Sequence, residues 1–383
     1  MMSVDRPRVL HLSARRFWCG ESNRVRVICQ GLHDRQWSIL LGVPADSALT
    51  EVAREKNLPV DDRFQFRGGC RPFSLGHDIR ALRQLQREQA FDMVHLHTSI
   101  DTWVAALAFG FRHTAPRPLL IRTRHSDHAV RSDPVHRWLY GRVIDHVVLS
   151  SAALRVPLAG LIDSGVLSPE RTTVIHSSVD IERFNPDSVS GAAVRAELDL
   201  GERFCIGLVG RISEEKGHDL LLQILPDLIR IRPNICCVFA GTGPQEETLR
   251  ASVHRQGLSD YVRFAGFRSD MPAVIAALDL VVAPSRWVES SPGVVKEAMA
   301  MRKPVVAAAV GGVAEIVEDQ RSGRIVPREQ ATALLEALHQ LINDKELCRR
   351  LGDQARTRVV AQFSDVHLVD HTLQLYERLM ART

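Results

Sequence analysis

Two glutamates, Glu289 and Glu297, flank a segment whose residues suit phosphate binding. Each carboxylate can accept hydrogen bonds from sugar hydroxyls. Between them, Ser291 can cap a helix that takes Pro292 in its first turn and leaves backbone exposed at Gly293. The N-terminus of a helix has free N–H groups and a positive partial charge, so it attracts phosphate. Two carboxylates that can accept hydrogen bonds from sugar hydroxyls thus lie on either side of a phosphate-binding helix N-terminus. This arrangement predicts that the segment binds a nucleotide sugar.

A second group of candidates follows the apolar segment 205–209. Gly210 allows the backbone to approach a ligand closely. Arg211 offers a planar guanidinium and Lys216 a compact positive charge, and together they can neutralise a diphosphate leaving group. The alternative is that Lys216 pairs with one of the two glutamates directly before it.

The segment 239–244 repeats this pattern of a strand followed by glycines, here Gly241 and Gly243. The two glycines can line a nucleoside pocket. They can equally form a tight turn before a helix that begins near Gln245, and a turn is the simpler interpretation of each glycine taken alone.

Three histidines near predicted strand ends are further candidates. His125 follows the strand predicted at 119–124, and an ordinary pKa of about 6.5 suits a hydrogen bond to a donor sugar or proton transfer. A structural or exposed position is the alternative, because the chain has 16 histidines. His95 and His97 share one face of a strand, so a metal is conceivable. No third ligand is evident, and the prediction is that the protein binds no metal.

Short apolar segments alternate with helical segments along the chain, in two successive series. This pattern predicts an α/β fold of two doubly wound parallel sheets with helices on both faces. Ligands bind such folds at the carboxyl ends of the strands, so two facing domains predict a central cleft. The strands are predicted at 9–12, 38–43, 93–97, 119–124, 147–150 and 173–176, and then at 205–209, 236–240, 262–265, 280–283, 304–308 and 323–326.

A polar segment after residue 179 separates the two series. It predicts a hinge, with residues 1–185 as the first domain and residues 186–362 as the second. The amphipathic segment 366–380 predicts a long helix at the end of the chain.

The composition is that of a globular protein with room for two cores: 383 residues, 45% of them hydrophobic and 25% charged. Its apolar segments are too short to span a membrane. The first strand begins so early that a signal peptide is not expected. Seven cysteines without a Cys-x-x-Cys pair predict reduced thiols in a cytoplasmic protein.

Charge is distributed unevenly between the two halves. Residues 1–185 carry 25 Lys and Arg against 19 Asp and Glu, whereas residues 186–383 carry 24 against 26. An ordinary solvated surface is one explanation. The other is a basic first domain that faces an anionic acceptor or an anionic membrane surface. No nucleic-acid partner is expected.

Three motifs that would indicate other functions are missing from the sequence. The first domain has no Gly-x-Gly-x-x-Gly, which disfavours a nicotinamide dehydrogenase. The chain has no Gly-Lys-Ser/Thr phosphate loop. It also has no pair of aspartates separated by one residue, the arrangement with which transferases of the other common fold hold their metal.

Taken together, these segments resemble the retaining nucleotide-sugar glycosyltransferases of the GT-B fold, the group 1 type found among bacterial cell-envelope glycan transferases. Glu289 to Glu297 matches the family's motif of two glutamates separated by seven residues, and the loop 210–217 matches its phosphate-binding loop. Further similar segments occur in the family's order at 179–184, 239–243, 264–266, 297–307 and 363–364. The last of these begins a C-terminal segment, 363–383, that crosses back to the first domain in the family.

The resemblance implies roles for single residues. Glu289 contacts the donor hexose, Glu297 accepts from the ribose hydroxyls, Arg211 and Lys216 hold the diphosphate, and His125 contacts the donor sugar. The other donor-site positions that it implies are Gly20, Gly210, Gly241, Gly243, Phe267, Pro292, Gly293 and Val294.

The sequence departs from the family's pattern in two places that bear on the site. The first loop of the family is richer in glycine, whereas here only Gly20 remains after Trp18 and Cys19. The segment 290–292 replaces a more common glycine-containing spacing, which changes the expected shape of the sugar pocket.

The activity implied is transfer of a sugar to a hydroxyl acceptor with retention at the anomeric carbon, in lipopolysaccharide, capsule or other envelope glycan synthesis. The expected donor is a UDP- or GDP-sugar, the acceptor a glycan or glycolipid, and no cofactor or metal is expected. The expected location is the cytoplasm, with peripheral attachment to the inner face of the membrane as an option. The alternatives are a nucleotide-sugar epimerase or hydrolase of the same fold and a binding protein without turnover.

Overall fold

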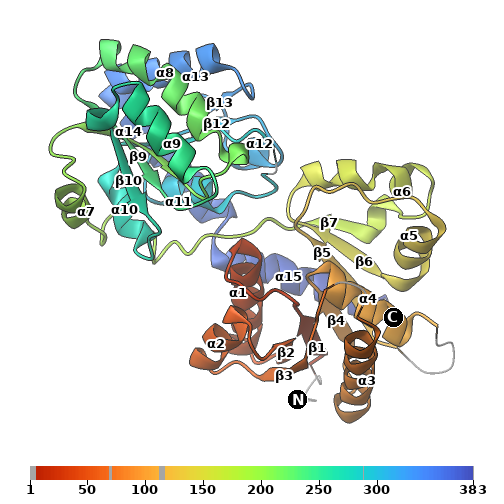
Figure 1. Cartoon of the computed structure of the whole chain (residues 1–383). Coiled ribbons are helices and arrows are strands. Elements are labelled where there is room, and N and C mark those ends of the chain that lie inside the picture. The colour runs from red at the N-terminus through yellow and green to blue at the C-terminus, as the bar shows by residue number, and fades with distance from the viewer. Residues whose placement is uncertain (1–5, 69–70, 112–116, 288, 383) are drawn as a thin grey trace. The chain divides into compact units, whose positions relative to one another are not determined.

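The computed structural model describes residues 6–68, 71–111, 117–287 and 289–382. The chain divides into two compact units: unit 1 comprises residues 1–177 and 366–383, and unit 2 comprises residues 178–365. Each unit is a parallel sheet covered by helices (Figure 1). The predicted α/β fold with two doubly wound sheets is therefore confirmed.

The sheet of unit 1 has seven parallel strands within the described residues, in the order β3-β2-β1-β4-β5-β6-β7. All but the edge strands β3 and β7 consist mainly of buried residues, because helices cover both faces of a parallel sheet. The strands are β1 (Arg8–Leu12), β2 (Ser38–Pro44), β3 (Val60–Phe64), β4 (Met93–Leu96), β5 (Leu119–Arg124), β6 (His146–Leu149) and β7 (Thr172–Val174). The helices are α1 (Gly20–Asp34), α2 (Ala48–Glu55), α3 (Pro72–Gln89), α4 (Ser99–Phe109), α5 (Pro134–Trp138), α6 (Ala159–Asp163) and the terminal α15 (Asp365–Met380).

Strand β3 is the one element of this sheet that the sequence does not predict. It lies at the edge of the sheet and pairs with β2. Only Phe64 of its five residues is buried, and the others include two aspartates and an arginine. An edge strand has solvent on one side and needs no continuous apolar run, so periodicity does not reveal it.

Unit 2 has six parallel strands in its described residues, in the order β10-β9-β8-β11-β12-β13. The strands are β8 (Phe204–Val209), β9 (Ile235–Ala240), β10 (Val262–Gly266), β11 (Leu280–Ala283), β12 (Val305–Ala308) and β13 (Arg324–Val326). The helices are α7 (Ala192–Glu197), α8 (His218–Ile231), α9 (Glu246–Arg255), α10 (Met271–Ala277), α11 (Gly293–Ala300), α12 (Val313–Ile316), α13 (Ala331–Asn343) and α14 (Lys345–Gln362).

Each sheet separates two apolar clusters, because successive side chains of a strand point to opposite faces. In β1, Leu10 and Leu12 belong to one cluster and Val9 to the other. In β8, Ile206 and Leu208 likewise lie in a different cluster from Cys205. Two buried layers in each unit hold the strand ends, and hence the loops that follow them, in fixed positions.

The terminal helix α15 contributes its apolar face to the core of unit 1. Leu368 and Tyr376 are buried in the cluster that contains Val9. On its outer side, Asp370 accepts a hydrogen bond from Arg35 at 2.6 Å. Among the described helices, none combines the length and the apolar character that a membrane span requires.

Strand order changes direction once in each sheet. The reversal lies between β1 and β4 in unit 1 and between β8 and β11 in unit 2. At such a point the loops after the two strands diverge to opposite faces, which leaves a crevice at the carboxyl ends of the strands. Of the candidate residues, Gly20 follows β1, Arg211 and Lys216 follow β8, and Glu289 follows β11.

Candidate functional site

In unit 2, the change of strand order brings together the loops after β8 and β11. The Lys216 ammonium donates to the carboxylate of Glu289, 73 positions further along the chain. The Ser285 hydroxyl donates to the same carboxylate oxygen at 2.7 Å. Lys216 therefore pairs with Glu289 and not with the glutamates that precede it. The two segments singled out in the sequence meet in one site.

Arg286 also links the loops after β8 and β11 to each other. The backbone N–H of Arg286 donates to the carbonyl of Glu215 at 2.8 Å, and its guanidinium donates to the carbonyl of Glu214 at 2.8 Å. The same guanidinium forms a bidentate pair with Asp219, at 2.6 and 2.9 Å. This pair raises the pKa of Arg286. Neither Arg286 nor Ser285 stands out in the sequence, although both directly follow a buried strand.

Arg211 follows Gly210 in the same loop as Lys216, but its guanidinium is free. Its side chain is exposed, and no hydrogen bond or ion pair of its guanidinium is formed with the described residues. Gly210 has a φ of 143°, and a Cβ at this position would meet nothing nearer than the Lys216 stem at 3.9 Å. The loop thus offers one free cation, one paired cation and open space at Gly210.

Helix α11 begins one residue later than the expected capping residue implies. Pro292 occupies the N-cap position and Gly293 is the first helical residue. The Ser291 hydroxyl does not cap the helix; it accepts a hydrogen bond from the buried Lys296 at 2.8 Å. The first N–H groups of the helix, including those of Gly293 and Val294, have no intrahelical acceptor. They remain available to an anion.

Glu297 lies in the second turn of α11 and is half-buried. Burial raises its pKa, and the charges of Lys296 and Arg183 act in the opposite direction. A desolvated carboxylate gains more from a hydroxyl donor than an exposed one does, because water no longer competes for it. The position suits a hydrogen-bond acceptor better than a surface charge.

The loop after β12 supports Glu289 from its backbone side. The N–H of Gly312 donates to the Glu289 carbonyl at 2.7 Å. Gly311 has a φ of 54°, and a Cβ there would overlap the same carbonyl group. These two glycines hold Glu289 in place, and a pair of glycines after a predicted strand is the signal that could have revealed them.

Close packing of the backbone explains why both Gly241 and Gly243 are glycines. A Cβ on Gly241, where φ is 143°, would overlap the carbonyl of Gly210. A Cβ on Gly243 would overlap the carbonyl of Ile212. The loops after β8 and β9 therefore lie backbone against backbone. This backbone contact holds the loop that carries Arg211 in position. The role does not depend on which ligand the loop binds.

Two other predicted donor-site residues lie in open positions. Phe267, which follows β10, is 81% exposed. Gly20 is the first residue of α1 in unit 1, and a Cβ there would meet no atom within 4 Å. Neither residue is held by its surroundings, so the structure gives no packing reason for either residue type.

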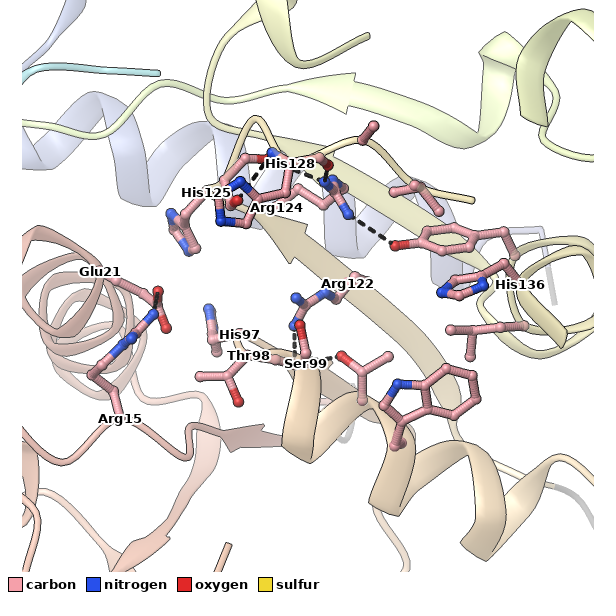
Figure 2. A pocket seen from close by; sticks show the side chains of 17 residues that line it. Arg15, Glu21, His97, Thr98, Ser99, Arg122, Arg124, His125, His128 and His136 are labelled. Atoms are coloured by element: carbon pink, nitrogen blue, oxygen red, sulfur yellow. Dashed lines mark hydrogen bonds and ion pairs between the residues drawn. The ribbon is translucent and has the colours of Figure 1, made fainter. Parts of the chain in front are cut away.

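Unit 1 contains a pocket of about 250 Å³ at the carboxyl ends of β1, β4 and β5 (Figure 2). Its wall is rich in nitrogen: Arg15 and Glu21 come from the β1–α1 segment, His97 follows β4, and Arg122, Arg124 and His125 belong to β5 or directly follow it. The predicted candidate His125 thus lies in a pocket at the switch point of its own sheet.

His125 is uncharged at neutral pH. Burial and the charges of nearby arginines, Arg24 first among them, hold the pKa of His125 well below 6.5. A ring with so low a pKa is a weak base, because efficient proton transfer needs a pKa near the working pH. Its Nε2 atom has no hydrogen-bond partner within the described structure. Hydrogen bonding to a ligand therefore suits His125 better than proton abstraction.

A network of buried histidines adjoins the pocket. His11 Nδ1 and His97 Nε2 are 3.1 Å apart, and His95 bonds to the hydroxyls of Thr123 and Tyr376. Ring nitrogens of the three histidines lie within 4.8 Å of one another. His11 is the third histidine that the sequence does not reveal, because it stands on β1, next to β4 in the sheet.

Burial lowers the pKa of His11 to about 3, and burial with neighbouring charges places the pKa values of His95 and His97 well below 6.5. The charge of Arg24 contributes to the lowering for both His95 and His97. The same charge disfavours a metal cation among these rings. The absence of a metal stays a prediction.

Models of two protein families match the chain. Residues 193–358 match the family described as "Glycosyl transferases group 1", and residues 19–183 match "Glycosyltransferase Family 4". Between them the two matches include the loops after β4, β8 and β11.

Curated relatives extend the likeness. The D-inositol 3-phosphate glycosyltransferase of Salinispora arenicola is 30% identical over 313 residues, which are 76% of this chain and 69% of that protein. The lipopolysaccharide core biosynthesis mannosyltransferase LpsB of Rhizobium meliloti is 32% identical over 216 residues, 54% of this chain and 61% of that protein. Another relative is 33% identical, over a match that spans 49% of this chain and 49% of that relative's own length.

A solved structure has the same fold. The crystal structure of Anabaena HepE in complex with UDP superposes with a TM-score of 0.80 at 24% identity, and the match covers 98% of this chain and 100% of that one.

Proposed function

Because this chain belongs to the glycosyltransferase group 1 family, we propose that it transfers a sugar from a nucleoside-diphosphate sugar to a hydroxyl acceptor with retention at the anomeric carbon. The contact between Lys216 and Glu289 carries this proposal. It joins the residue expected to bind the diphosphate to the residue expected to bind the sugar.

The proposed donor site is the switch point of unit 2. Arg211 and the N–H groups at the start of α11 bind the diphosphate, since a free guanidinium and a helix N-terminus both favour phosphate oxygens. Lys216 joins them by sharing its protons between the diphosphate and Glu289. Glu297 accepts hydrogen bonds from the ribose. The nucleotide is proposed to be UDP or GDP, with no metal required.

Catalysis in this proposal is mainly electrostatic. The bond from the anomeric carbon to the diphosphate breaks, and negative charge develops on the leaving oxygen, where Lys216 and Arg211 stabilise it. Glu289 is held by Lys216, Ser285 and the backbone of Gly312, so it orients the sugar. The proton of the acceptor hydroxyl passes to the leaving phosphate.

The acceptor is proposed to bind in the pocket of unit 1. A glycan or glycolipid of the bacterial envelope is the proposed class, supported by the lipopolysaccharide core named for the Rhizobium relative. The neutral His125 donates or accepts a hydrogen bond at the edge of this pocket. The proposed location is the cytoplasm, at or near the inner face of the membrane.

A thermal-shift screen with UDP-, GDP- and ADP-sugars tests the donor assignment. A ligand that binds the folded state raises the melting temperature by mass action. One class of nucleotide sugar is expected to raise it, and the rise is expected to disappear in Arg211→Ala. Lys345→Ala, which removes an exposed lysine of α14, is the matched control. A chain that binds none of these nucleotides contradicts the proposal.

Proton NMR of the product tests the stereochemistry. An α-configured donor is expected to give an α-linked product, and an inverted product rejects retention. Incubation of the donor without an acceptor is the control, since turnover of the donor alone at the full rate indicates an epimerase or hydrolase.

A further inference from the structure

We propose that the pocket of unit 1 binds an oxyanion, a phosphate or carboxylate group carried by the acceptor. This inference rests on the proposed function, which places the acceptor in that pocket. It adds the chemical class of the acceptor: an acidic molecule rather than a neutral glycan.

The side chains that line the pocket carry a net positive charge. Three arginines and one glutamate line it, namely Arg15, Arg122, Arg124 and Glu21. Glu21 pairs with Arg15 at 2.6 Å. Arg124 donates to the carbonyl oxygens of Ser126 and His128 and to the Tyr140 hydroxyl, all of them uncharged partners.

Arg122 is the cation with the most to gain from a ligand. It is buried on β5, and one of its terminal nitrogens donates to the carbonyl of Thr98. Its Nε atom has no hydrogen-bond partner in the described part of the chain. Figure 2 shows its side chain among those of the pocket wall.

The carboxylate of Asp101 compensates the charge of Arg122 only in part. Asp101 Oδ1 is 3.6 Å from Arg122, too far for a hydrogen bond. Both Asp101 oxygens are already occupied by the N–H and hydroxyl of Thr98. Burial raises the pKa of Asp101 to about 7, although Arg122 acts to lower it.

A fourth arginine adds positive potential from inside the unit. Arg24 of α1 is 2% exposed, and none of its three guanidinium nitrogens has a hydrogen-bond partner among the described residues. Its charge lowers the pKa values of His97 and His125, which both line the pocket. The field of Arg24 therefore reaches the pocket wall. An isolated buried charge is costly, and an anion nearby offsets that cost.

The unpaired polar atoms of the wall fit an oxyanion. His97 Nδ1, His125 Nε2 and Arg122 Nε lack partners, and each of these nitrogens can carry a hydrogen. An oxyanion has several lone pairs and accepts from several donors at once, in charge-assisted bonds. A neutral sugar hydroxyl accepts at most two hydrogen bonds and leaves the excess positive charge uncompensated.

Calorimetric titration with inorganic phosphate tests the site apart from catalysis. The Arg211→Ala chain is used, because it lacks the free guanidinium of the donor loop. Phosphate is expected to bind to it, and a further Arg122→Gln change is expected to weaken binding at least about tenfold. Arg80→Gln, which removes an exposed arginine of α3 outside the pocket wall, is the matched control and is expected to change binding less than about twofold.

Arg122 also holds the Thr98 carbonyl, so a second measurement leaves its side chain intact. In histidine labelled with nitrogen-15, phosphate is expected to shift the resonances of His97 and His125 in the Arg211→Ala chain. The inference is overturned if these resonances do not move, if phosphate does not bind to Arg211→Ala, or if Arg122→Gln binds as well as Arg80→Gln.

Sugar-transfer assays with an acidic acceptor and its neutral parent test the preference for an oxyanion during turnover. A sugar phosphate or uronic acid is expected to give a kcat/KM at least about tenfold above that of its neutral parent. Arg122→Lys is expected to keep this preference and Arg122→Gln to lose it. Equal use of both members overturns the inference and leaves the proposed function standing, whereas failure to use any nucleotide sugar rejects the proposed function alone.

The oxyanion can belong to a soluble molecule or to a lipid headgroup. Glycerol 3-phosphate and vesicles that contain phosphatidylglycerol serve as competing probes in the transfer assay. Inhibition by the soluble probe indicates a soluble acceptor, and inhibition by the vesicles alone indicates a lipid-linked one. Inhibition by neither probe, at concentrations where phosphate binds, counts against the inference.

Discussion

The switch points of units 1 and 2 hold their positive charges differently. In unit 2, Lys216 pairs with Glu289, and Arg286 pairs with Asp219. In unit 1, the buried Arg24 has no described partner, and Arg122 has one carboxylate at 3.6 Å. A site with internal ion pairs is ordered in advance, but its ligand must compete for the cation. A site in which some cations lack a close carboxylate partner gains more free energy when an anion arrives.

The largest effect is expected from breaking the pair in unit 2. Lys216→Ala removes a cation from the leaving diphosphate and should lower turnover roughly a hundredfold to a thousandfold, the range for losing one preorganised donor. Steady-state kinetics measures the loss, and circular dichroism checks the fold. Lys345→Ala should keep full activity. Full activity of a folded Lys216→Ala chain would reject the role of Lys216 in binding phosphate.

The next largest effect is expected at Gly241, which packs against the loop that carries Arg211 and Lys216. Gly241→Ala forces a Cβ into the Gly210 carbonyl at a φ of 143°, and it should lower the free energy of unfolding by about 3 kcal/mol. Gly20→Ala meets no atom within 4 Å and should be neutral or slightly stabilising. Urea denaturation compares the two variants. Equal stabilities would show that the two loops can separate without cost.

Acid should affect the histidine network of unit 1. The pKa of His11 is lowered to about 3, so below pH 6.5 the unfolded chain takes up a proton that the folded chain does not. Stability therefore falls as pH falls below 6.5, by up to about 1.4 kcal/mol per pH unit for this residue. His11→Gln should flatten the slope of unfolding free energy between pH 6.5 and 5 by that amount. An unchanged slope would mean that His11 is protonated in the folded state.

The smallest effect is expected from separating the two glutamates of unit 2. Glu297→Ala should weaken donor binding about tenfold, the loss of one good hydrogen-bond acceptor, and leave the turnover number near its original value. Glu289→Ala should mainly lower turnover, because Glu289 orients the sugar in the proposed mechanism. Calorimetry gives the dissociation constants and initial rates give the turnover numbers. The opposite pattern would exchange the roles assigned to the two residues.

The sequence is informative where structure depends on residues close together in the chain. Parallel strands buried on both faces appear as apolar runs, which is why the central strands are predictable. The polar edge strand β3 is not. Glu297 in α11 is predictable from helix signals, although the helix starts after Pro292 and Ser291 bonds to Lys296 instead of capping it.

Contacts across the sheets are less predictable. Nothing in the spacing indicates that Lys216 reaches Glu289 rather than its own neighbours, since the contact depends on β8 lying beside β11. His11 joins His97 for the same reason, because β1 lies beside β4. Arg24 is an ordinary residue of an amphipathic helix until the fold shows that its side chain is buried.

The bonds of Arg286 set a condition for building hybrid enzymes from this chain. They join the loop after β11 to the carbonyls of Glu214 and Glu215 and to Asp219 at the start of α8. A loop transplanted from a homologue with a different residue at either end would leave a guanidinium or a carbonyl without its partner. Segments 211–219 and 284–291 therefore have to be exchanged as one cassette if donor preference is to be moved between proteins.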